Sequence, residues 1–322
     1  MRVDIATITI IRAAVNLLGT CVMRSSYHTG RFSQPGVGRK AWLTVHHRAS
    51  KLDPCKNIVW QHKLLTAACT ATDGAMERNV ATPAIVLQTQ RSGDLHRTIT
   101  LLSPALGIIR VRAYGARKGK LAGRIEQFLC GTFHLYHNPV KGEYSVVDVE
   151  PHIGSERLRS DLGRTFAASF IAEMVLRMEG GDSRQVHGLV EAAVTALDGS
   201  EEVERTLIQF IWRFMAVAGL QPDLTCCPCC DRPYRNDEIL SFNTTLHSPC
   251  CRDCSDVDHA DFPMALGPGA RRYLEATTPL PFEDALHVGL SATAALRLKR
   301  YMLRYASIVS GGMLKTLGFA ME

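Results

Sequence analysis

Residues 97–118 read RTITLLSPALGIIRVRAYGARK, and this stretch decides the fold class of the chain. Both halves are rich in β-forming residues, and Ser103, Pro104 and Gly107 mark a turn between them. Similar runs flank the stretch, namely AIVLQTQ at 84–90, FLCGTFHLYHNP at 128–139 and YSVVDVEP at 144–151. Five short strands within residues 80–152 predict an OB-type barrel, a fold that commonly binds oligonucleotides, with an SH3-like barrel as the alternative.

The pattern changes to helical after Pro151. Apolar residues then recur close to every 3.6 positions, at Leu158, Leu162, Phe166, Phe170, Ile171, Met174 and Leu176. The run TLIQFIWRFMAVAGL at 206–220 is apolar on nearly all sides, which predicts a buried central helix ended by Gly219, with Trp212 in the core. Two later runs, ARRYLEATTPLP and SATAALRLKRYMLRYASIVSGGMLKTLGF, predict helices that close a bundle over 153–322. The last is basic, and we expect its cations to form a solvated face: Arg297, Lys299, Arg300 and Arg304.

Residues 1–75 show no sustained period of 2 or 3.6, whereas strand patterns begin within ten residues of Met76. We therefore expect an unstructured segment and a translation start at Met76, with a disordered basic extension as the alternative. Charge is divided in the same way, since residues 1–75 hold ten Lys or Arg and three Asp or Glu. Residues 76–125 hold nine basic and two acidic residues, and 126–322 come to about −8. A basic module thus precedes an acidic one.

Seven of the eleven cysteines crowd into residues 225–256, in TCCPCCDRPYRNDEILSFNTTLHSPCCRDC and its margins. Crowding of this kind favours a metal in a reducing compartment, hence a cytoplasmic protein, over a secreted disulfide framework. Cys251 and Cys254 form one Cys-x-x-Cys knuckle, and the first knuckle is either Cys227 with Cys230 or Cys226 with Cys229. Two knuckles provide a closed four-sulfur shell for one structural Zn²⁺. Free thiols are the alternative. No run of about eighteen apolar residues exists, so no membrane partner is expected.

The strand at 107–114 predicts a nucleic-acid surface. Alternation places Ile108, Arg110, Arg112 and Tyr114 on one face. The charge continues through the glycine-containing segment after it, at Arg117, Lys118, Lys120 and Arg124. Cations that follow phosphates, together with an aromatic ring that stacks on a base, suit single-stranded DNA. An edge strand protected by charges is the alternative.

Together these features resemble the RecO family. TITLLSPALGIIRVRAYGARKGK is similar to the family stretch that leads into "KGAR", although Tyr114 stands where lysine is common. FIWRFMAVAGLQPDLTCCPCC is similar to the family's "GxxPxLxxCxxC", and this alignment assigns Cys227, Cys230, Cys251 and Cys254 as the metal ligands. The chain departs from the pattern where Asp231, His247 and Ser248 replace family glycines.

The resemblance implies a DNA repair and recombination mediator that binds single- and double-stranded DNA and anneals complementary strands. It implies partnership with RecR, recognition of the tail of single-strand-binding protein, indirect action on RecA, and a place at the bacterial nucleoid during repair. It implies no catalytic residues, and the sequence carries no Walker A loop or His-Glu-x-x-His motif. A zinc-ribbon or OB protein of transcription or RNA processing is the alternative, and a zinc hydrolase would need an open coordination position.

Overall fold

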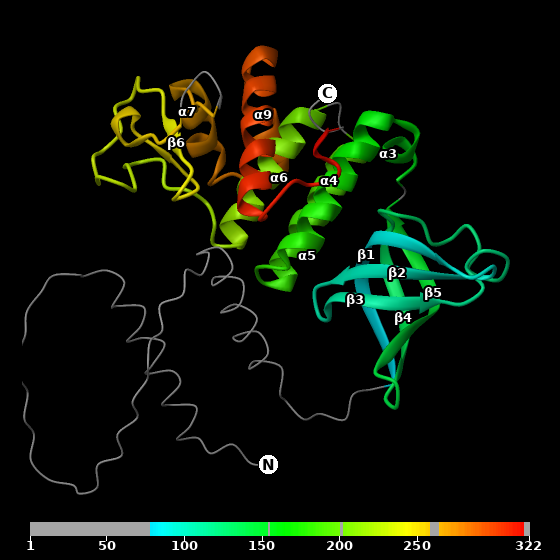
Figure 1. Ribbon diagram of the computed structural model, residues 1–322. Helices are drawn as coiled ribbons and strands as arrows, with labels where there is room; N and C mark the ends of the chain where they lie inside the picture. Colours follow the sequence, from blue (N-terminus) through cyan, green and yellow to red (C-terminus); the bar gives the residue numbers. More distant parts are fainter. Residues whose placement is uncertain (1–77, 154, 200–201, 258–263, 319–322) are drawn as a thin grey trace, which may run out of the picture. The chain divides into compact units, whose positions relative to one another are not determined.

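The computed structural model describes residues 78–153, 155–199, 202–257 and 264–318 (Figure 1). The expectations for residues 1–75 and for a start at Met76 lie outside these ranges. Within them, no helix has both the length and the apolar character that crossing a bilayer demands.

The first part of the described chain is a closed five-stranded barrel. Its strands are β1 (Asn79–Ser92), β2 (His96–Ser103), β3 (Gly107–Ala113), β4 (Cys130–Asn138) and β5 (Glu143–Ile153). They pair in the order β1-β2-β3-β5-β4, and the barrel is closed by a short parallel pairing of β3 with β5. All five predicted strands are confirmed, and the barrel is OB-like.

Alternation along the strands fills the barrel interior. Ile99, Val111, Phe133 and Val149 are each at most 1% exposed, and all belong to one cluster inside the barrel. The long strand β1 pairs with β4 through its first half and with β2 through its second half, with a bulge between Val86 and Gln88. Such a bulge bends a strand, which allows one strand to serve two neighbours around a small barrel.

The segment between β3 and β4 does more than connect two strands. Ala116, Leu121 and Ile125 are buried in the barrel cluster, each no more than 4% exposed. The basic segment predicted as an open loop is therefore partly anchored to the barrel core. This anchoring restricts where its cations lie.

The second part is helical (Figure 1). Its helices are α3 (Glu156–Ser160), α4 (Leu162–Met178), α5 (Ser183–Gly199), α6 (Val203–Val217), α7 (Pro268–Thr277), α8 (Phe282–His287) and α9 (Ala292–Val309). The helix α6 is central, because it contacts α4, α5, α8 and α9. Trp212 of α6 is 5% exposed and donates its indole N–H to Thr278 Oγ1 at 2.9 Å, so it is a core residue as predicted.

One cation of α9 is not where the sequence pattern placed it. Arg297 and Arg300 are exposed, but Lys299 is 6% exposed and its Nζ lies 3.6 Å from Glu204 Oε1 of α6. The prediction of a solvated face is wrong for Lys299, because the packing of α9 on α6 covers that side. Burial with a carboxylate partner compensates its charge.

Candidate metal centre and nucleic-acid interface

Four cysteine sulfurs gather in the segment between α6 and α7. Among the described residues, the Sγ atoms of Cys227, Cys230, Cys251 and Cys254 lie within 4.8 Å of one another. The first pair lies within a tight turn in which Asp231 N donates to Cys227 O at 2.9 Å. The second pair follows the hairpin of β6 (Ser241–Asn243) and β7 (Ser248–Cys250), and ends in the short 3-10 helix η1 (Arg252–Cys254).

The spacing of these sulfurs fits a tetrahedral zinc ion. Four sulfurs at about 2.3 Å from a central zinc lie about 3.8 Å from one another. Cys230 Sγ and Cys251 Sγ are 3.8 Å apart. The donor set is therefore suited to Zn²⁺, and its closed shell leaves no position for a substrate.

The backbone around Cys227 favours a thiolate. Burial by itself would raise the pKa of the Cys227 thiol, but the N–H groups of Cys251, Cys229 and Cys230 point at its sulfur and lower the pKa to about 6. Arg232 holds the first knuckle in place, since its carbonyl accepts from Cys227 N at 2.9 Å and its guanidinium donates to Glu238 Oε2 at 3.1 Å. Metal ligands are commonly oriented by such outer contacts.

The neighbouring cysteines have different surroundings. The Cys226 thiol donates to Asp223 Oδ2 at 3.4 Å. Cys250 is fully buried, and burial raises its pKa to about 12. Cys229 is exposed, and its sulfur is not part of the group of four found among the described residues. The register with Cys227 and Cys230 is thus the one that completes the four-sulfur group.

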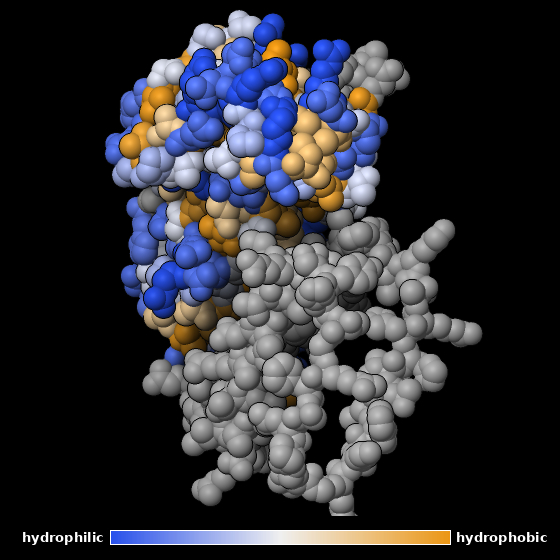
Figure 2. All heavy atoms as spheres, turned by 90° about the vertical axis from the view of Figure 1, so that its left-hand side faces the viewer, coloured by the Kyte–Doolittle hydropathy of each residue, from blue (hydrophilic) through white to orange (hydrophobic). Residues whose placement is uncertain are grey.

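The four-cysteine module, residues 225–256, is attached to the helical core rather than isolated from it. Phe242 is fully buried and its ring lies edge-on to Tyr305 of α9, with centroids 6.3 Å apart. Arg271 of α7 donates to Arg235 O at 2.7 Å. In Figure 2 the coloured part of the face beside β6 and α7 is mostly hydrophilic, with hydrophobic residues in separate patches. The apolar residues of the module are thus largely used against the helices.

The predicted DNA residues on β3 point outward. Arg110, Arg112 and Tyr114 are exposed, whereas Val111 and Ala113 between them are buried. Cross-strand pairing extends this face over β2 and β1, because Arg110 lies opposite Thr100 and Arg112 opposite Thr98. The outer face of β1, β2 and β3 thus carries rows of polar side chains.

The cations divide into two groups by their partners. Several are engaged by the barrel itself: Arg112 pairs with Glu143 at 3.2 Å, Lys120 and Arg124 pair with Asp148 at 2.9 and 2.7 Å, and Arg117 donates to Asp94 O at 3.1 Å. In the described part of the chain, no ion pair or hydrogen bond is found for the side chains of Arg110 and Lys118. These two are the cations most readily offered to a phosphate.

Sequence alternation along β3 missed five residues of this face. Gln88 lies opposite Thr100, and Gln90 opposite Thr98, so each arginine row continues across three strands. His96 accepts from Gly115 N at 3.1 Å and lies edge-on to Tyr114, with ring centroids 5.1 Å apart. The alternation of β2 and β1 carried this signal, but only the strand register aligns it with β3.

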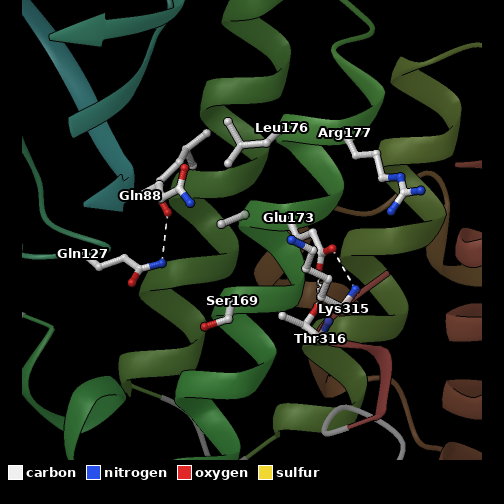
Figure 3. A pocket seen from close by; sticks show the side chains of 10 residues that line it. Gln88, Gln127, Ser169, Glu173, Leu176, Arg177, Lys315 and Thr316 are labelled. Atoms are coloured by element: carbon white, nitrogen blue, oxygen red, sulfur yellow. Dashed lines mark hydrogen bonds between the residues drawn. The ribbon is translucent and has the colours of Figure 1, made fainter. Parts of the chain in front are cut away.

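A pocket of about 400 Å³ lies between α4, β1 and the C-terminal segment (Figure 3). Glu173 of α4 accepts from the backbone N–H groups of Lys315 and Thr316 at 2.7 and 2.9 Å, and Gln127 donates to Leu87 O at 3.0 Å. Arg177 donates to Met313 O at 2.9 Å. The polar side chains of α4 therefore hold the segment that follows α9.

Comparison with known proteins gives two family matches. The model described as "Recombination protein O N terminal" matches residues 76–152. The model described as "Recombination protein O C terminal" matches residues 159–318. These matches cover the barrel and the helical part, including the four cysteines.

Curated relatives carry the same name. The chain is 30% identical to DNA repair protein RecO of Roseiflexus sp. (strain RS-1) over 240 residues, which are 71% of this chain and 81% of the relative. It is 27% identical to DNA repair protein RecO of Bacillus subtilis (strain 168) over 241 residues, 73% of this chain and 91% of the relative. With the protein of that name from Synechococcus elongatus it shares 34% over 158 residues, 47% of this chain and 59% of the relative.

Proposed function

Because the chain belongs to the RecO family of DNA repair proteins, we propose that it is a non-enzymatic recombination mediator that binds single-stranded DNA on its barrel. We propose further that it binds double-stranded DNA, anneals complementary strands, and with RecR helps to load RecA onto strands coated by single-strand-binding protein. We propose that the protein acts in the cytoplasm, at the nucleoid during repair. The zinc ion has a structural role.

The observation that carries the proposal is the outer face of β3. Arg110 and Arg112 alternate there with buried residues, and Tyr114 follows at its end beside His96. Exposed cations neutralise phosphates, and an exposed ring stacks on a base without regard to sequence. Tyr114 is 52% exposed, so its ring is open to such stacking.

The test compares two pairs of cations. Replacing Arg110 and Lys118 with alanine should flatten the dependence of log affinity on log salt by about 1.4, since each lost phosphate contact on a single strand contributes about 0.7. The matched variant replaces Arg297 and Arg300 with alanine. Both residues are exposed on α9, and their replacement removes the same amount of charge. Fluorescence anisotropy on a labelled oligonucleotide measures both slopes.

An unchanged slope in the Arg110 and Lys118 variant, or a flattened slope in the α9 variant, would place the DNA elsewhere. Tighter binding to RNA than to DNA of equal length would favour a role in RNA processing. For the mediator role, annealing of complementary strands coated with single-strand-binding protein should be stimulated by the wild type and weakened in the barrel variant. Equal annealing with and without protein contradicts it.

A further inference from the structure

The pocket beside α4 borders the DNA surface proposed above. Gln88 of β1 is one of its lining residues. On the outer face of the barrel, Gln88 lies opposite Thr100 of β2, and Thr100 lies opposite Arg110 of β3. Neighbouring strands are about 4.8 Å apart, so this row spans about 10 Å from the exposed arginine to the edge of the pocket. A single strand that follows the row therefore reaches the pocket.

The part of the pocket next to the barrel combines apolar walls with two side-chain amides. Leu87 and Ala172 are buried and Leu176 is partly buried, and all three line the pocket. Figure 3 shows the amides of Gln88 and Gln127 on the barrel side. Each amide offers a carbonyl acceptor and an NH₂ donor. Apolar walls suit the faces of a planar base, and amides suit its edge, which is how unstacked bases of single strands are commonly bound.

The opposite side of the pocket is basic (Figure 3). Arg177 and Lys315 line it, and both are exposed. The guanidinium of Arg177 donates one N–H to Met313 O, and among the described residues no ion pair or hydrogen bond is found for the side chain of Lys315. The carboxylate of Glu173 also lines the pocket, but it accepts from the backbone of the C-terminal segment and from the Thr316 hydroxyl. Two cations thus face one carboxylate that is already engaged.

We propose that this pocket is a nucleotide subsite, in which one base of a bound single strand leaves the outer face of the barrel and inserts between β1 and α4. The amides of Gln88 and Gln127 hydrogen-bond the edge of the base. The adjacent phosphate lies against Arg177 and Lys315. The pocket volume of about 400 Å³ is in the range of roughly 300–1,000 Å³ that is usual for small-molecule sites. The proposal rests on the DNA surface proposed above and extends it beyond the barrel.

The first experiment maps the inserted base. The full chain is mixed with an oligothymidylate that carries one photoreactive 4-thiothymidine, irradiated, digested with trypsin and analysed by mass spectrometry. We expect crosslinks in the tryptic peptide 165–177, which belongs to α4, as well as in the peptides of the barrel face. Gln88→Ala should reduce the crosslink in peptide 165–177 severalfold and leave those of β3 in place.

The second experiment measures the phosphate contact. Lys315→Ala should flatten the dependence of log affinity on log salt by about 0.7, the contribution of one phosphate on a single strand. Arg272→Ala is the matched control, because Arg272 is exposed on α7 and outside the pocket, and its slope should equal that of wild type. The unfolding midpoint of Lys315→Ala should stay at the wild-type value, since the backbone of Lys315, and not its side chain, bonds with Glu173.

The absence of crosslinks in peptide 165–177 would overturn the insertion of a base, and a wild-type slope in Lys315→Ala would overturn the phosphate contact. If the Arg110 and Lys118 variant still flattens the slope in that case, the DNA surface of the barrel stands and only the subsite fails. If neither variant changes the slope, the proposed function itself is contradicted.

Discussion

Two residues of the four-cysteine module, residues 225–256, hold backbone conformations that favour glycine. Asp231 has φ 56° and His247 has φ 49°, both in the left-handed region. These are two of the positions where the resembling family has glycine, so the turns are kept although the residues differ. A side chain in this region costs roughly 1–2 kcal/mol, less for Asp, whose short side chain forms local hydrogen bonds.

We predict that His247→Gly stabilises the protein by about 0.5–1 kcal/mol, the relief of left-handed strain less the greater chain entropy of glycine. The same change also removes a buried imidazole nitrogen, Nδ1, for which no hydrogen-bond partner is found in the described residues. Ser248→Gly is the control, because Ser248 lies in β7 without a positive φ and glycine there should destabilise. Thermal or denaturant unfolding measures both, and a lower stability of His247→Gly contradicts the account.

A second prediction at this scale concerns the ligands. Cys251→Ser should release zinc and lower the midpoint of thermal unfolding, because the remaining sulfurs no longer close the shell. Cys226→Ser should do neither, since its thiol is directed at Asp223. Metal analysis should find close to one zinc per wild-type chain. Zinc lost from the Cys226 variant would move the first knuckle by one residue, and zinc kept by the Cys251 variant would remove Cys251 from the ligands.

At the scale of elements, β5 already holds two cations of the segment before β4, for which a DNA phosphate would have to compete. Asp148 accepts from Lys120 and Arg124, and these contacts with the N–H of Val149 hold the pKa of its carboxyl well below its ordinary value. Asp148 therefore stays ionised at neutral pH. Phosphate has to displace it before it gains either cation.

We predict that Asp148→Asn strengthens binding of single-stranded DNA and steepens the salt dependence by up to about 1.4, as two cations are released to phosphates. Glu150→Gln is the control, because it removes the same charge from the same strand. Glu150 pairs with His134 and not with a cation of the segment before β4. Anisotropy titrations at several salt concentrations compare them. Equal effects of the two variants would mean that only the general field of the barrel had changed.

A second carboxylate with a lowered pKa, that of Glu173, joins the helix α4 to the segment that follows α9. Burial alone would raise the pKa of Glu173, but the N–H groups of Lys315 and Thr316 and the Thr316 hydroxyl outweigh it and lower the pKa. A carboxyl with a lowered folded pKa contributes stability above its unfolded pKa of about 4.3, and loses it as pH falls through the folded pKa.

Glu173→Gln should therefore reduce stability by about 1 kcal/mol at neutral pH, the loss of charge-assisted bonds at a partly exposed site. The difference from wild type should shrink as pH falls below about 4. Glu275→Gln, at an exposed position of α7, should change little at any pH. Urea unfolding at a series of pH values measures this, and a difference that does not depend on pH contradicts the role of the carboxylate.

At the scale of the whole molecule, the two family models together match residues 76–152 and 159–318. We predict that a chain beginning at Met76 keeps its zinc, its unfolding midpoint and its affinity for single-stranded DNA. The barrel interior is filled by side chains from residues 84–149, which this chain retains. Metal analysis, calorimetry and anisotropy compare it with the full chain. Insolubility of the shorter chain, or a native N-terminal peptide from within residues 1–70, would contradict the prediction and the proposed start.

The sequence by itself determined the order of elements and the spacing of the two cysteine knuckles. Strand alternation and helical spacing are local properties, so the runs around Ile99 and Phe210 predicted a barrel followed by a buried helix. The four-cysteine spacing is also local to two knuckles. The spacing does not decide between Cys226 and Cys227 as the first ligand, because the pairs 226/229 and 227/230 are equally spaced. Only the folded module brings one set of sulfurs together.

The tertiary structure decided which basic side chains are paired with a carboxylate and which are left for a ligand. Arg112, Lys120 and Arg110 look alike in a sequence, but the folded barrel brings Glu143 and Asp148 to the first two, from positions 28 or more residues away. Lys299 is covered for the same reason, since α6 lies against its side of α9. Pairings between distant segments depend on how the elements pack, and no local pattern of residues encodes them.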